Sequence, residues 1–284
     1  MTIPLSCKNI LAATLAASAL TFAGTACATP FVFSTGDPDG KIATGSRPSS
    51  AGKIEIESAD DFKLSDHTRI TNASFTGLLP DIRNVGSVIV EIYRVFPFDS
   101  TIPPNGKVTT RVNSPSDVAF DSRSNGSGLS FATTVLNGTF TAANSVLNGI
   151  HPKPNEFTGG EGSVSGQEVR FDVAFTTPFD LPAGHYFFIP QVEVTGGEFL
   201  WLSAPKPITG GTGPFLGDLQ SWIRNEEISP DWLRIGTDIT HQGPFNAAFS
   251  LQGATVPEPG SYTLMLAGLA IVGVLRRRRT RRPS

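Results

Sequence analysis

The middle of the chain alternates apolar and polar residues with the period of two that is typical of β-strands. The segment 168–175, EVRFDVAF, places an apolar side chain at every second position, and 53–57 alternates in the same way. Further strands are predicted at 87–96, 186–194, 199–202 and 245–251. Pro190 interrupts the segment 186–194, which indicates an edge or bulged strand, because proline cannot donate to a strand ladder.

Turn-forming residues separate these segments and define the fold class. Clusters such as 103–106 (PPNG) and 124–128 (SNGSG) are typical of tight turns. Many short strands with frequent turns favour an all-β fold: a single large β-sandwich or jelly-roll-like domain. One short helix is expected at 219–227, where Asp218 can cap the first turn and Leu219, Trp222 and Ile223 share a face.

The first 28 residues are typical of a secretory signal peptide. Lys8 supplies the positive start, 10–22 is an uncharged apolar run, and small residues at 26–28 favour cleavage between Ala28 and Thr29. A buried N-terminal helix is disfavoured, because the run has no polar face. Cys27 leaves a lipoprotein signal as a minor alternative.

The last 29 residues combine a Pro-rich motif, an apolar segment and a basic block. The motif is Val256, Pro257, Glu258, Pro259 and Gly260, and a helix is predicted over about 261–275. The basic block consists of Arg276, Arg277, Arg278, Arg279, Arg281 and Arg282. The apolar core of this helix, 264–275, spans only about 18 Å of a ~30 Å hydrocarbon layer. A transient transmembrane sorting helix fits this length better than a permanent single-span anchor.

This tripartite tail resembles the PEP-CTERM sorting signal of Gram-negative bacteria, also called the ice-binding protein C-terminal domain. The resemblance covers the tail alone and leaves the central domain unassigned. It implies export, transient retention in the inner membrane, and processing by an exosortase-type enzyme near 257–259, after signal peptidase has acted. It further implies a destination at the cell surface or in the exopolysaccharide matrix. Whether the tail is cleaved or stays as an anchor is left open.

The net charge and the cysteine content of the central domain differ from those of the whole chain, because the two ends hold many of the residues concerned. The whole chain has 22 Lys and Arg, 25 Asp and Glu, and two cysteines. The ends hold seven of the basic residues, one acid and both cysteines, so residues 29–256 keep 15 basic and 24 acidic residues and a net charge of −9. We therefore divide the chain into a signal peptide (1–28), an exported β-domain (29–255) and a sorting signal (256–284). An acidic domain argues against nucleic acid as a partner.

Candidate chemistry in the domain is sparse. We find no nucleophile elbow, phosphate loop or zinc motif, and we expect no cofactor, although structural calcium is open. The candidate calcium ligands are two acidic groups, Asp37 with Asp39, and Glu57 with Asp60 and Asp61, for which ordinary turn formation is the favoured interpretation. The candidate platforms for stacking on sugars are Trp201, Trp222 and Trp232, whose apolar neighbours favour core packing.

Three functions are compatible with these features of the sequence. The first is a non-enzymatic cell-surface or matrix protein, favoured by the specific tail and the absence of a catalytic motif. The second is a carbohydrate-binding module that takes extracellular polysaccharide as its partner. The third is a hydrolase with paired carboxylates, for which 24 acids supply candidates without singling any out.

Overall fold

The computed structural model describes residues 28–50, 52–101, 108–150, 157–205, 219–256 and Gly268. Most of the predicted signal peptide, the predicted helix at 261–275, the residues Pro257–Gly260 and the arginine block lie outside this described part. Within it, no helix has the length and apolarity needed to cross a membrane. Residues Pro30–Thr255 form one compact unit, and Met1–Thr29 with Val256–Ser284 are assigned to a second.

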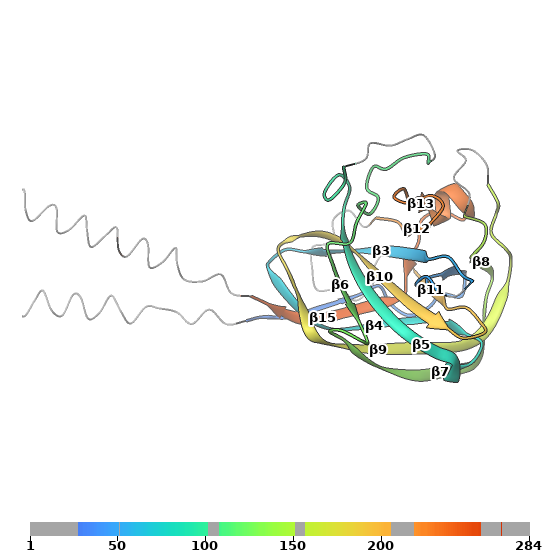
Figure 1. Cartoon of the computed structure of the whole chain (residues 1–284), viewed down its shortest axis with the longest axis horizontal. Helices are drawn as coiled ribbons and strands as arrows, with labels where there is room; N and C mark the ends of the chain where they lie inside the picture. Colours follow the sequence, from blue (N-terminus) through green and yellow to red (C-terminus); the bar gives the residue numbers. More distant parts are fainter. Residues whose placement is uncertain are drawn as a thin grey trace, which may run out of the picture. The chain divides into compact units, whose positions relative to one another are not determined.

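The unit Pro30–Thr255 consists of two β-sheets (Figure 1). The first sheet contains β1 (Pro30–Ser34), β2 (Ile42–Gly45), β4 (Thr68–Leu79), β7 (Ser130–Ala142), β8 (Asn144–Val146), β9 (Val164–Leu181), β11 (Leu200–Ala204), β14 (Asn246–Ala247) and β15 (Phe249–Thr255). The second contains β3 (Ile56–Leu64), β5 (Val85–Arg94), β6 (Asp121–Ser124), β10 (Gly184–Val194), β12 (Trp222–Asn225) and β13 (Leu233–Arg234). Two helical turns, η1 (Ile82–Asn84) and η2 (Ile235–Ile239), lie between strands. The predicted all-β fold is confirmed.

The first sheet branches at β4. One side of β4 pairs with β9, which in turn pairs with β7. The other side pairs with β15 and then, near its end, with β11. Beyond these, β1 lies next to β15, β2 and β14 pair with β11, and β8 pairs with β2 in parallel. The second sheet has the order β13-β12-β3-β10-β5-β6 and is antiparallel throughout.

The main hydrophobic core lies between the two sheets. In β9 the alternation predicted from the sequence is realised, because Val169, Phe171 and Val173 are buried in the core. Across the core, aromatic rings of the two sheets stack: the centroids of Phe188 in β10 and Phe249 in β15 are 5.0 Å apart with an angle of 3° between the ring planes. Such offset contacts add to the free energy of burying the rings themselves. The many phenylalanines of the sequence are thus the contact between the sheets.

The predicted helix at 219–227 is wrong. This segment contains β12, which pairs antiparallel with β3 so that Arg224 lies opposite Glu57. All four residues of β12 are buried, including Arg224 and Asn225. An amphipathic helix would have exposed those polar residues to water, whereas the strand gives Arg224 a buried ion-pair partner. Long-range pairing therefore overrides the local helical pattern.

Two strand boundaries also differ from the sequence pattern. The strand predicted at 53–57 begins at Ile56 and continues to Leu64, while Lys53 makes only an isolated bridge with Ser50. Pro190 is internal to β10 and lies opposite Val90 of β5, but the pairing of β10 with β3 ends at Phe188. Its missing N–H therefore costs no ladder hydrogen bond on the β3 side.

Candidate functional site

The two acids predicted near residue 37 form a turn. Asp37 is exposed, whereas Asp39 accepts hydrogen bonds from the backbone N–H of Lys41 (3.0 Å) and from the Ser203 hydroxyl (2.5 Å). Asp39 thus ties the turn to β11. Its bonding is that of a turn-forming residue.

The second acidic group is divided by strand geometry. Asp60 is buried and accepts from the Ser221 hydroxyl (2.8 Å) and from the Ala247 N–H (2.9 Å). Asp61 points to the opposite face of β3, as successive residues in a strand do, and contacts His185 Nε2 at 2.5 Å. Among the described residues, no three His, Cys, Asp or Glu side chains are placed so that they could hold a metal ion together.

The three candidate tryptophans are buried. Trp201 and Trp222 are 1% exposed and Trp232 is 0% exposed. The indole N–H of Trp201 donates to the Ala248 carbonyl (2.9 Å), and that of Trp232 donates to the Ser116 carbonyl (3.1 Å). Stacking on sugars is therefore excluded for these rings in this conformation. The core-packing alternative describes them correctly.

Sequence reasoning missed a buried ionic cluster on the face of the second sheet that points away from the main core. Glu57 forms an ion pair with Arg224 and accepts a hydrogen bond of 2.8 Å from the Tyr93 hydroxyl. The same hydroxyl lies 3.3 Å from a carboxyl oxygen of Glu91. The guanidinium of Arg224 lies over the Trp232 ring, 4.3 Å from its centroid, which adds a cation–π contact.

This cluster shifts the protonation of its members. Burial, followed by the charge of Glu57, raises the pKa of Glu91 to about 8. Burial and the same charge raise the pKa of Tyr93 above its usual value. Burial alone would lower the pKa of Arg224, but the neighbouring Glu57 raises it. Glu91 is consequently a mostly neutral carboxylic acid at pH 7.

A second ionic group fixes the segment 108–120. Arg111, whose side chain is 1% exposed, forms ion pairs with Asp117 and, at 3.1 Å, with Asp231. Its guanidinium also lies 4.3 Å from the centre of the Phe96 ring. Asp117 lies six positions from Arg111, but Asp231 belongs to a distant segment beyond β12, so no local pattern in the sequence joins the three residues.

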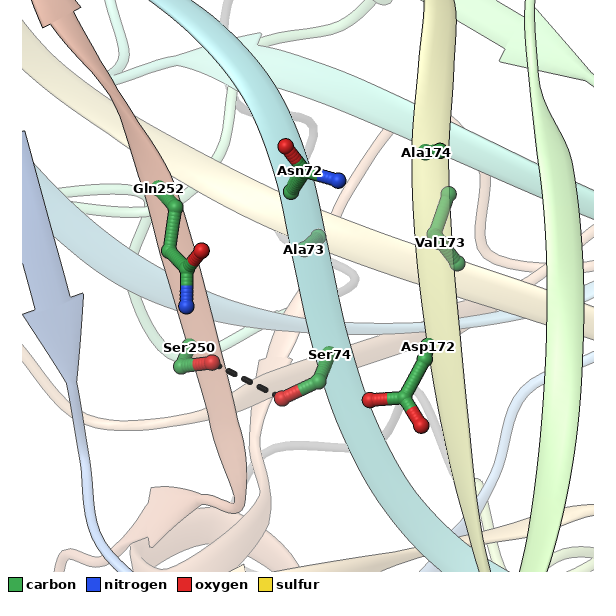
Figure 2. Close-up of a pocket in the computed structure, with 8 residues that line it drawn as sticks. All are labelled: Asn72, Ala73, Ser74, Asp172, Val173, Ala174, Ser250 and Gln252. Carbon is green, nitrogen blue, oxygen red and sulfur yellow. Dashed lines mark hydrogen bonds between the residues drawn. The ribbon is translucent and has the colours of Figure 1, made fainter.

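An open polar surface lies on the outer face of the first sheet. Figure 2 shows side chains from β15, β4 and β9 around a shallow hollow of about 230 Å³. Ser74 and Ser250 share a hydrogen bond of 2.8 Å there. The hollow is lined by Asn72, Ala73, Ser74, Asp172, Val173, Ala174, Ser250 and Gln252.

The strand register explains why this surface is flat and polar. One row across five strands joins Ser34, Ser250, Ser74, Asp172 and Ala132, and the next joins Val32, Gln252, Asn72, Ala174 and Ser130. These are mostly small side chains. The amides of Asn72 and Gln252 are exposed, and neither makes a hydrogen bond within the described part of the chain. They are available to an external donor or acceptor.

A second hollow, of about 470 Å³, lies beside β12. It is lined by Thr110, Val112, Asn113, Leu219, Gln220, Trp222, Arg234 and Pro244. The Trp222 indole N–H is buried and has no hydrogen-bond partner among the residues that the structure describes. Arg234 is already paired with Asp238 at 2.6 Å, so its charge is compensated.

The described residues thus define a β-sandwich with two buried ionic groups and one flat polar sheet face. Residues 255–279 match the family model of the PEP-CTERM protein-sorting motif, which includes Val256–Gly260 and Arg276–Arg279 of the predicted tail. The match supports export and delivery to the cell surface or extracellular space of a Gram-negative bacterium by an exosortase-type signal. No curated protein and no solved structure matches the chain.

Proposed function

We propose that the protein is a non-enzymatic component of the cell surface or exopolysaccharide matrix. In this proposal signal peptidase removes residues 1–28, the C-terminal helix holds the chain transiently in the inner membrane, and an exosortase-type enzyme processes it near 257–259. The β-sandwich is then the part that acts outside the cell. The matched sorting motif supports the route.

The proposal that the domain is not an enzyme rests on the structural role of its buried acidic residues. Glu57, Asp60 and Asp61 each connect β3 to another segment, through Arg224, Ser221 and His185 respectively. A carboxylate-dependent hydrolase would require a pair such as Glu57 and Glu91 to reach a substrate. Glu57 is 3% exposed, and Arg224 and Tyr93 bind its oxygens.

The route is tested in a host that possesses an exosortase. We expect Glu258→Ala, or deletion of residues 276–282, to retain the full chain in the membrane fraction. Glu227→Ala is the matched control, because Glu227 is an exposed glutamate outside the motif. Surface delivery of the Glu258 and deletion variants at the wild-type level would refute the sorting role of the tail.

A second candidate function, carbohydrate binding, is favoured by the polar sheet face. Exposed amides that lack internal partners can bind sugar hydroxyls by paired hydrogen bonds, and the hollow at Asn72 and Gln252 offers two of them on neighbouring strands. This surface replaces the tryptophans as the candidate sugar site. In this second candidate function the protein binds the polysaccharide itself, whereas in the first it can associate with the matrix through contacts with other proteins.

Polysaccharide pull-down with the full chain decides between the two. If the polar face binds glycan, Asn72→Ala and Gln252→Ala should each weaken retention roughly 5- to 15-fold, as expected for a lost hydrogen bond of about 1–1.5 kcal/mol. Ser122→Ala, an exposed change on β6 of the other sheet, should leave retention unchanged. Failure of the wild-type chain to bind any polysaccharide would reject the second candidate and leave the first.

A further inference from the structure

Strand β7 is a long open edge of the first sheet. It runs for 13 residues, Ser130–Ala142, and pairs with β9 alone (Figure 1). In the described part of the chain, no backbone hydrogen bond is made by β7 on the side that faces away from β9. Alternate N–H and C=O groups of an antiparallel edge strand point outward and require a partner, which is either water or another strand.

The other described edge strands have the features that usually prevent such pairing. β6 has four residues and carries the charged pair Asp121 and Arg123. β1 has five residues and begins with Pro30, β8 has three residues, and β13 and β14 have two each. Short length and charged side chains are the common protections of natural sheet edges. These edges therefore offer little surface to an incoming strand.

β7 is neither short nor charged, and its two register shifts against β9 fall after Val135, which leaves Ser130–Val135 regular. Its sequence, SFATTVLNGTFTA, contains no charged residue and no proline, and it is rich in β-branched threonine. Its middle exposes two large apolar side chains, Val135 (39% exposed) and Leu136 (41% exposed). The register with β9 shifts between Val135 and Asn137, so both apolar residues lie where this regular stretch of the edge ends.

We propose that β7 is a self-association surface, at which two copies of this chain pair antiparallel, edge to edge. A two-fold axis perpendicular to the strand would join the first sheets of both copies into one continuous sheet. Pairing over the regular stretch Ser130–Val135 would satisfy about six backbone groups of each copy by hydrogen bonds in place of water. This assembly goes beyond sorting and surface attachment, and it is independent of glycan binding.

We take a second copy of the chain as the occupant, because β7 brings no charge to an edge-to-edge contact. Residues 29–256 carry a net charge of −9, so most contacts between copies bring like charges together. Self-pairing of β7 places no charged residue of that strand opposite its own copy, because the strand has none. Self-pairing of β6 would instead bring Asp121 and Arg123 against a partner that carries the same residues. At β7, two identical acidic domains can therefore pair edge to edge without placing like charges of the paired strands opposite each other.

The test is sedimentation velocity of the purified full chain in detergent over a wide range of concentrations. We expect the wild type to form a concentration-dependent dimer, and Val135→Lys with Leu136→Lys to weaken dimerisation at least tenfold, because each copy would then bring like charges to the paired edge. Val118→Lys is the matched control: Val118 is 57% exposed but lies outside β7, and its replacement should leave dimerisation unchanged.

A second measurement distinguishes pairing of β7 from misfolding of the variant and from association through the ends of the chain. Amide hydrogen exchange of the wild type should slow in β7 as concentration rises, while β6 stays unchanged. A wild type that remains monomeric would overturn the proposal. So would a lysine variant that dimerises like the wild type, or slowed exchange at β6 in place of β7.

Discussion

Replacing Glu91 by glutamine should remove a specific dependence of stability on pH. Glu91 lies on β5 beside Glu57, and burial together with that charge raises its pKa from 4.5 to about 8. Between these two pH values the folded protein keeps a proton that the unfolded chain releases. Raising the pH through this interval therefore favours unfolding, and the stabilisation is fully present only below the pKa of the unfolded chain.

The size of the effect follows from one proton. A difference of one bound proton changes the free energy of unfolding by about 1.4 kcal/mol per pH unit. Between pH 5.5 and 7.5 the wild type should therefore lose about 2–3 kcal/mol through this carboxyl group. Glutamine has the same shape as the neutral acid and cannot ionise, so the Glu91→Gln protein should lack this loss.

Urea denaturation at pH 5.5, 6.5 and 7.5 measures the difference between the two proteins. Comparing the variant with the wild type at each pH removes the contribution of all other titrating groups. Glu227→Gln is the control for a glutamate that is exposed on the surface. If the stabilities of the wild type and Glu91→Gln change in parallel from pH 5.5 to 7.5, the assigned protonation of the cluster is wrong.

Three further changes test the packing and the ionic cluster by urea denaturation. Phe171→Ala removes a buried core ring that stacks on Phe75 of β4 and should cost about 3–5 kcal/mol; a cost below ~1 kcal/mol would contradict its place in the core. Arg224→Leu leaves Glu57 buried without its cation and should cost about 3–5 kcal/mol, of which a second change, Glu57→Gln, should restore a part; absence of any restoration would argue against the ion pair. Gly253→Ala places a methyl group against the backbone carbonyl of the paired strand and should cost about 1–3 kcal/mol, whereas Gly138→Ala, with open space around it, should be nearly neutral.

The sequence predicted the fold where the signal was local. The alternation in 168–175 depends on each residue and its near neighbours, and β9 buries Val169 and Phe171 as the pattern requires. The apolar context of Trp201 indicated core packing for the same reason. The tail motif was recognised because its three parts are contiguous in the sequence.

The features that the sequence did not predict depend on contacts between distant residues. Arg224 and Glu57 are 167 positions apart, and their pairing turns a segment with helical spacing into β12. The polar sheet face also depends on register, since Asn72 and Gln252 become neighbours only when β4 and β15 pair. Asp60 and Asp61 looked like one acidic group, but the geometry of the strand directs them to opposite faces.

The most direct test of surface delivery is to recover the protein from intact cells of a host with an exosortase and to measure its mass. Labelling with a reagent that does not cross the membrane selects the surface pool, and mass spectrometry then defines both ends of the labelled chain. If the proposed route is correct, the labelled protein begins at Thr29 and ends near 257–259, without the arginine block. An unlabelled protein that stays in the cytoplasm with Met1 and residues 276–282 intact would contradict it.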